Sequence, residues 1–146
     1  MAKWDQARVT KPHQINTRRR KLDDVLFDDW IVREYRRNRG FTALIILIST
    51  ANDGVLPLRS TYTHVIGDEL DWHQFVVLMQ GARVNWDGVL LVPLVGAGGG
   101  PVADSIAAEA LRALEDRVNA DRMVVNEGHF FDKWGRRMKV EPLLAN

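Results

Sequence analysis

The segment VPLVGAGGGPVAD, residues 92–104, joins an apolar run to four glycines in five positions, a proline and an acidic residue. A glycine loop ahead of a helix can bind a phosphate, because the first N–H groups of a helix lack intrahelical partners and carry partial positive charge. The same loop can instead serve only as a hinge between a strand and a helix. The candidate ligand-binding residues of this loop are Gly96, Gly98, Gly99, Gly100 and Ser105.

The loop departs from the known phosphate-binding motifs at important positions. A Walker loop needs Lys and then Ser or Thr after its last glycine, where this chain has Pro101, Val102 and Ala103. In the pattern G-x-G-x-x-G counted from Gly96, the third glycine is replaced by Pro101, which also lacks an N–H donor. Asp104 would repel a phosphate. We therefore favour a hinge in which Pro101 begins the helix, with phosphate binding as the alternative.

A second polar loop follows the most apolar stretch of the chain. Asn52 and Asp53 come shortly after FTALIILIS, residues 41–49. In open α/β sheets, ligands collect at the carboxyl ends of strands, so this loop and the glycine loop could share a crevice for a small-molecule ligand. A plain Asn-Asp-Gly turn is the favoured interpretation, because these residues suit turns through local hydrogen bonds alone.

Basic residues gather near the N-terminus. Residues 1–40 contain 11 lysines and arginines against 6 aspartates and glutamates, whereas the other 106 residues contain 9 against 13. A basic segment could bind an acidic protein surface or a nucleic acid, although the chain has no RRM, KH or helix-turn-helix signature. A solvated arm with helix-end charges is the favoured alternative. The candidate partner-binding residues are Arg18, Arg19, Arg20, Lys21, Arg36 and Arg37.

Cysteine is absent, which excludes disulfides, thiolate metal sites and cysteine nucleophiles. The four histidines show no H-x-x-x-H or H-E-x-x-H spacing. A metal site built from His64, His73, Glu127 and His129 would need long-range convergence, so ordinary surface or hydrogen-bonded histidines are favoured. We predict no metal or cofactor.

The elements that must position these residues begin with a helix. Apolar residues at i, i+4 spacing from Leu22 predict an amphipathic helix that stops near Gly40. The apolar, β-branched stretch 41–49 predicts a central strand covered on both faces. Residues 60–66 predict a short strand, and Pro57 restricts the segment before it to a sheet edge or an irregular piece.

The middle of the chain contains one ambiguous segment and two clear ones. Residues 69–80 favour a helix between capping aspartates and a glycine, with a strand pairing through 85–88 as the alternative. Residues 88–95 predict a buried strand, in which Pro93 indicates a missing neighbour on one side. Apolar positions along 106–118 lie on one helical face and predict the most regular helix of the chain.

The C-terminal region predicts two strands, 122–131 and 136–143, joined by the turn DKWG with Gly135 at positive φ. If strand 88–95 and the strand from 122 are parallel neighbours, the strand, glycine loop, helix and strand form a right-handed βαβ unit. The prediction is a mixed α/β fold. It has a single sheet of about five strands, with a βαβ unit, a C-terminal hairpin and helices packed on the sheet.

The chain has 146 residues, which is the size of one domain. We predict a poorly ordered basic arm at 1–17 and a single domain at 18–146. The longest apolar run, 43–48, falls far short of the roughly 18 residues of a membrane helix. The N-terminus has no apolar core typical of a secretory signal, so we expect a cytoplasmic protein.

For function, we favour a non-enzymatic interaction protein whose basic arm and first helix engage an acidic partner. The alternative is a small-molecule or nucleotide-binding domain that uses the GAGGG loop. Enzyme activity is left open, because local spacing yields no complete catalytic set.

Overall fold

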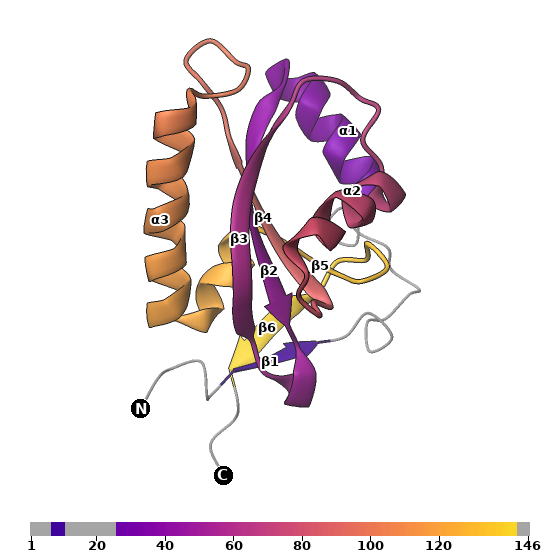
Figure 1. The fold of residues 1–146 in the computed structure, drawn as a ribbon, viewed down its shortest axis with the longest axis vertical. Coiled ribbons are helices and arrows are strands. Elements are labelled where there is room, and N and C mark those ends of the chain that lie inside the picture. Colours follow the sequence, from indigo (N-terminus) through magenta and orange to yellow (C-terminus); the bar gives the residue numbers. More distant parts are fainter. Residues whose placement is uncertain (1–6, 11–25, 143–146) are drawn as a thin grey trace.

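The computed structural model describes residues 7–10 and 26–142. Within these ranges, strands and α-helices follow one another in the order shown in Figure 1. Their bounds are β1 Ala7–Thr10, α1 Phe27–Asn38, β2 Phe41–Ser49, β3 Leu56–Val65, α2 Trp72–Met79, β4 Gly88–Leu94, α3 Asp104–Ala120, β5 His129–Asp132 and β6 Lys139–Pro142.

Four strands form an antiparallel sheet in the order β3-β2-β4-β5. Strand β2 is central, because it pairs with β3 along its whole length and with β4 on its other side. Its residues 41–48 are all buried, which confirms the prediction of a strand covered on both faces. Strands β1 and β6 form a separate two-stranded antiparallel sheet.

Helices cover both faces of the four-stranded sheet. Successive side chains of a strand point to opposite faces, so β2 contributes to two core clusters. Ile46 packs with Leu114 of α3 in one cluster, whereas Ile45 packs with Phe27 of α1 and Phe75 of α2 in the other. Figure 1 shows α3 on one side of the strands and α1 and α2 on the other.

This arrangement confirms a mixed α/β fold with helices packed on the sheet. The predicted parallel βαβ unit is wrong, because β4 and β5 are antiparallel neighbours. The apolar stretch that predicted the start of a strand forms a 3₁₀ helix, Arg122–Glu127, instead. The Asp121 carboxylate caps it by accepting the Met123 N–H at 3.0 Å, and the chain turns back before β5.

The predicted helices are present. Helix α2 confirms the helical interpretation of residues 69–80, and its cap is Asp71, whose carboxylate accepts the Gln74 N–H at 2.8 Å. Helix α1 ends at Asn38, close to the predicted stop. Helix α3 begins at Asp104, so Pro101 precedes the helix and is not its first residue.

The chain ends are arranged differently from the prediction. The turn after β5 is a tight hairpin turn, with Gly135 at φ 78° and the Asp132 N–H donating to the Arg136 carbonyl at 2.8 Å. Beyond it, β6 leaves β5 and pairs with β1. Residues 7–10 of the predicted arm therefore lie in a strand. The rest of that arm falls outside the described residues, so the domain boundary stays a prediction.

Proline residues mark where strands lack neighbours. Strand β5 pairs with residues 88–91 of β4, so among the described strands only β2 lies beside Pro93, as its sequence indicates. Pro57 lies in β3, which is an edge strand of the sheet. Both observations confirm the interpretation of these prolines.

Candidate functional site

The glycine loop packs against the C-terminal end of α1. The Gly100 N–H donates to the Asn38 carbonyl at 2.7 Å, and the loop closes on itself through the Gly96 N–H and the Gly100 carbonyl at 2.8 Å. Gly99 has φ +100°, and a Cβ there would lie 2.8 Å from the Asn38 oxygen, so this position requires glycine. Backbone carbonyls therefore already occupy N–H donors that a phosphate would need.

The two candidate ligand-binding loops lie at opposite ends of the sheet. Strands β2 and β4 are antiparallel, and Thr42, near the start of β2, pairs with Leu94 at the end of β4. The glycine loop follows Leu94, whereas Asn52 and Asp53 follow the other end of β2 in a 3₁₀ turn, Ala51–Asp53. The alternative of a shared crevice is wrong, because it required strands whose carboxyl ends meet at one edge, and the favoured interpretation of residues 52–54 as a turn agrees with this 3₁₀ turn.

Three polar side chains form a hydrogen-bonded chain that local spacing did not predict. The Thr42 hydroxyl accepts the Val102 N–H at 3.0 Å and is hydrogen-bonded to His64 Nδ1 at 2.8 Å. His64 Nε2 in turn lies 2.7 Å from Asp104 Oδ1. A hydroxyl, an imidazole and a carboxylate in this order can make a nucleophile, but Thr42 is 0% exposed and has no access to a substrate. These hydrogen bonds hold the segment after the glycine loop against β2 and β3.

The same hydrogen bonds affect the ionisation of two acidic groups at β3, Asp104 and Tyr62. The hydrogen bond from His64 lowers the pKa of the Asp104 carboxyl below its usual range. Desolvation, followed by the charge of Asp104, raises the pKa of Tyr62 above its usual value. A negative charge is therefore held at the start of α3, next to the end of β3.

The candidate basic residues are only partly described. Arg36 and Arg37 are exposed in the last turn of α1, and Asp28 and Asp29 occupy its first turn, in the order that the helix dipole favours. Arg36 also lies 3.8 Å from Asp68. The other candidates lie outside the described residues; they are Arg18, Arg19, Arg20 and Lys21.

His129 lies in a cation-rich, partly buried environment. Its ring contacts Trp30 in a tilted arrangement with centroids 4.6 Å apart, and its Nδ1 lies 2.9 Å from Arg137 Nη2. Burial first, then the charges of Arg137 and Arg37, lower the pKa of His129 to about 4. In the described part of the chain, no three histidine, aspartate or glutamate side chains gather as metal ligands.

Strand β3 leaves a ten-residue edge of the sheet open. Of the described strands, only β2 pairs with it. Its first half contains Pro57 and lies beside a register irregularity at 47–48 of β2, and both features discourage edge pairing. Its second half, STYTHV at 60–65, has no proline, glycine, lysine or carboxylate. This half is chemically suited to accept another strand.

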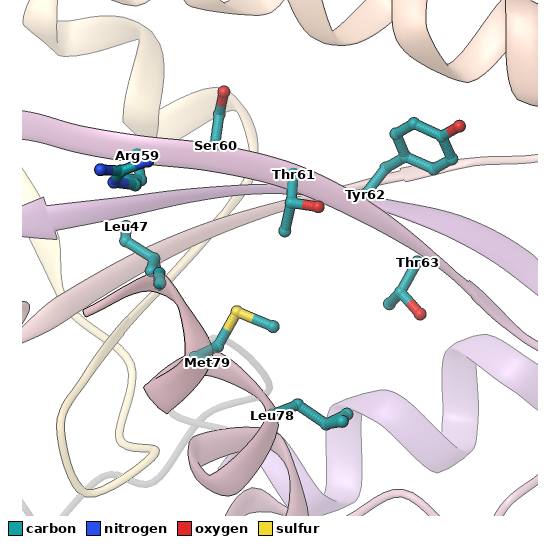
Figure 2. A pocket seen from close by; sticks show the side chains of 9 residues that line it. Leu47, Arg59, Ser60, Thr61, Tyr62, Thr63, Leu78 and Met79 are labelled. Carbon is teal, nitrogen blue, oxygen red and sulfur yellow. The ribbon is translucent and has the colours of Figure 1, made fainter. Parts of the chain in front are cut away.

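An apolar groove of about 400 Å³ borders this edge on the face covered by α2. Thr61 and Thr63 of β3 point to the same side as Leu78 and Met79 of α2, whereas Ser60 points away from them (Figure 2). Leu78 is 59% exposed. The groove therefore presents apolar surface directly beside strand backbone.

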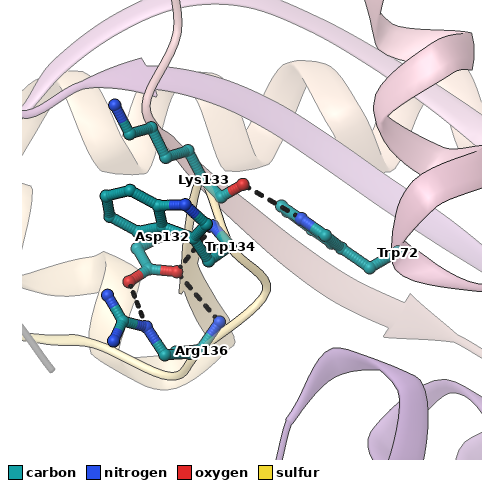
Figure 3. Close-up of polar contacts among 5 residues, drawn as sticks. All are labelled: Trp72, Asp132, Lys133, Trp134 and Arg136. Carbon is teal, nitrogen blue, oxygen red and sulfur yellow. Dashed lines mark hydrogen bonds and ion pairs between the residues drawn. The ribbon is translucent and has the colours of Figure 1, made fainter.

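The groove wall formed by α2 is fixed through its first residue. The Trp72 N–H donates to the Asp28 carboxylate at 2.6 Å, and the Trp72 indole donates to the Lys133 carbonyl at 3.0 Å. Figure 3 shows this indole beside the turn built around Asp132, which accepts the N–H groups of Trp134 and Arg136 at 2.9 Å each. The turn and α1 thus hold α2 against the sheet.

A second groove, of about 270 Å³, borders β3 on the opposite face, between its first half and α3. Ser60 donates a hydrogen bond to the Glu115 carboxylate. Asp116 and Asn119 also line the groove, and Arg59 lies at its boundary. Two carboxylates against one guanidinium make this groove net acidic.

Comparisons with protein-family models, with curated proteins and with solved structures find no match. Within the described ranges, no helix combines the length and apolar character needed to cross a membrane. The class of protein is therefore defined by its own fold and site. It is a mixed α/β protein with an open sheet edge between an apolar and an acidic groove.

Local sequence patterns did not point to this site directly. One available signal was FVVLM at 75–79, five consecutive apolar residues between two glutamines. A helix that covers a sheet on one side buries about half of such a run, so the remainder has to be exposed. Val77 and Leu78 are the exposed ones.

Proposed function

We propose that this protein is a non-enzymatic interaction protein that binds an extended segment of a partner protein along β3. The open ten-residue edge of β3, bordered by a groove on each face of the sheet, carries the proposal. An extended segment added to such an edge gains main-chain hydrogen bonds, and the adjoining grooves receive its alternate side chains.

The apolar groove supplies the main source of affinity in this proposal. A partner side chain placed between Leu78 and Thr61 would cover Leu78, which is now largely exposed. Complete burial of a fully exposed leucine is worth about 1.5–3 kcal/mol, so covering the exposed part of Leu78 is worth roughly 1–2 kcal/mol. A contact of this size is enough to make binding strongly dependent on Leu78, since 1.4 kcal/mol corresponds to about a tenfold change in affinity.

A second copy of the chain is the competing occupant of the edge. Antiparallel β3–β3 pairing about a two-fold axis perpendicular to the sheet would bring both α3 helices to the same face. If residues 60–65 pair with themselves, Ser60 of one copy lies opposite Val65 of the other, so Glu115 of one copy would approach Asp104 of the other. Because like charges repel, we favour a segment of a different protein.

Selection from a random decapeptide library against the immobilised full chain tests the proposal. Selected peptides are measured by fluorescence anisotropy with two variants, Leu78→Asp and the control Ile106→Asp, which changes a side chain of similar exposure on α3. We expect at least tenfold weaker binding to Leu78→Asp and unchanged binding to Ile106→Asp. The amides of an extended peptide form two alternating sets that point to opposite edges, and only one edge faces β3. N-methylation should therefore weaken binding for one set of amides and not for the other.

Two results would overturn the proposal. One is a library that yields no peptide sensitive to Leu78→Asp. The other is a dimer of the chain in sedimentation that Leu78→Asp dissociates, which would make a second copy the occupant. Circular dichroism of both variants checks that each remains folded.

The basic arm and α1 remain a second candidate surface, for an acidic partner. The observation that favours it is the run of exposed arginines on α1, namely Arg33, Arg36 and Arg37. We expect a pull-down with a polyglutamate resin at low salt to retain the full chain. Substitution by glutamate of Arg18, Arg19, Arg20, Arg36 and Arg37, which leaves β1 and its pairing with β6 in place, should abolish retention. Retention of that variant would reject this surface.

A further inference from the structure

We propose that the segment bound along β3 carries two basic residues four positions apart on the α3 face and apolar residues between them on the α2 face. This inference rests on the proposed function and specifies the class of partner that the same site takes. It follows from the positions of three acidic side chains and of the apolar groove relative to β3.

Carboxylates of α3 lie beside two residues of β3 that share one face. Asp104 contacts His64, and Glu115 accepts a hydrogen bond from Ser60. Ser60 and His64 are four residues apart, which corresponds to about 13 Å along a strand. Side chains at positions i and i+4 of an added strand have the same spacing, so one strand can reach both carboxylates.

Two of the three carboxylates, those of Asp104 and Asp116, are exposed, whereas Glu115 is half-buried and accepts the hydrogen bond of Ser60. The Asp104 side chain is 77% exposed. Its hydrogen bond with His64 lowers its pKa and keeps it charged near neutral pH. Asp116 is exposed beside Glu115 and adds to the negative charge at the other end. Of the arginines of α3, Arg117 is paired with Glu127, and none lines either groove.

The opposite face selects for different side chains. Thr61 and Thr63 lie between Ser60 and His64 in the sequence and face the groove formed with Leu78 and Met79 (Figure 2). Arg59, at the end of this groove, is its one charged lining residue among those described. A lysine placed beside Thr61 or Thr63 would lose hydration without gaining a carboxylate, so apolar side chains are favoured there.

Together the two faces define the pattern basic, apolar, any, apolar, basic. Three decapeptides with identical flanks test it: one with the core Lys-Val-Thr-Val-Lys, one with Glu-Val-Thr-Val-Glu, and one with Val-Lys-Thr-Lys-Val. The last has the same composition as the first but places its lysines two positions apart, so a single strand cannot satisfy both ends of the acidic face. Binding to the full chain is measured by fluorescence anisotropy at low and high salt.

We expect the first peptide to bind at least tenfold more tightly than the other two at low salt. The difference should shrink at high salt, because the charged contacts are exposed and screened. In the double variant Glu115→Gln, Asp116→Asn the preference should fall several-fold. Glutamine at 115 keeps an acceptor for Ser60. The control Glu109→Gln changes an exposed residue of α3 outside both grooves and should leave the preference unchanged.

The outcomes separate this inference from the proposed function. If library-selected peptides require Leu78 but lack the paired basic residues, the function stands and this inference is overturned. If the three decapeptides bind equally, or the glutamate peptide binds best, the inference is likewise overturned. If no peptide depends on Leu78, the proposed function itself fails and this inference fails with it.

Discussion

The Nε–H of Arg122 donates to the carbonyl of Val55 at 3.0 Å, joining the segment after α3 to the residue just before β3. The same guanidinium donates to the Val118 carbonyl at 2.6 Å. Arg122 is only 5% exposed, so its replacement leaves buried carbonyls without this donor. We expect Arg122→Met to lower the free energy of unfolding by about 2–3 kcal/mol in urea denaturation. The control Arg112→Met, on the exposed side of α3, should stay within about 0.5 kcal/mol of the wild type.

The glycine loop should respond to substitution according to how closely it is packed. Gly99→Ala would place a Cβ 2.8 Å from the Asn38 oxygen at a positive φ, so we expect a loss of about 2 kcal/mol in thermal or urea unfolding. Gly81→Ala meets no atom within 4 Å and should be neutral or slightly stabilising. Equal stability of the two variants would show that the loop does not pack on α1 as described.

Nucleotide binding at the glycine loop has its own test. Because the N–H groups of Gly96 and Gly100 donate to backbone carbonyls, we expect nucleotides and phosphorylated metabolites to leave the melting temperature unchanged. Thermal-shift screening of the full chain measures this. A stabilising compound whose effect is lost in Gly98→Leu would support the nucleotide-binding alternative instead.

The stability of the fold should depend on His129 in mildly acidic solution. Folding lowers the pKa of this imidazole to about 4, so between about pH 6.5 and 4 the unfolded chain binds a proton that the folded chain does not. Stability is therefore complete above pH 6.5 and falls as the pH drops towards 4. The loss should be about 2 kcal/mol, less than the full shift implies because the ring is partly exposed. Urea denaturation across this range should show a flatter profile for His129→Gln.

A control for this prediction acts on the neighbouring charge. Arg37→Gln removes one of the two arginines that lower the pKa of His129, so the pKa should rise. An NMR titration of the His129 ring protons measures it directly. An unchanged or lower pKa would contradict the assigned cause.

Local patterns predicted the elements better than their directions. The apolar run of β2 and the helical periodicity of α3 are properties of adjacent residues, and both elements occur where the sequence indicates. The direction of β5 depended on residues 122–127, whose apolar side chains also suit a strand. Asp121 caps that segment through the Met123 N–H, and Arg122 bonds to Val118 of α3 four residues earlier. Arg122 also bonds to Val55, 67 residues away in the sequence, and no local window contains that contact.

The candidate site was hidden for a related reason. Pro57 indicated an edge strand, but which groups border that edge depends on the packing of α2 and α3 on opposite faces. Thr42, His64 and Asp104 are separated by 22 and 40 residues in sequence, and only the fold joins them. The alternative of a shared crevice was wrong for the same reason, since its existence depended on strand direction.

The pairing of β1 with β6 has a mechanical consequence. Ala7 pairs with Pro142, so the first and last described strands enter their small sheet side by side from the same end. Tension applied to the two chain ends would peel this pair apart one hydrogen bond at a time, as a zipper opens, instead of shearing all of its bonds together. The β1–β6 pair would therefore open first, at low force. The four-stranded sheet, which includes β3 and its open edge, would still be folded at that force.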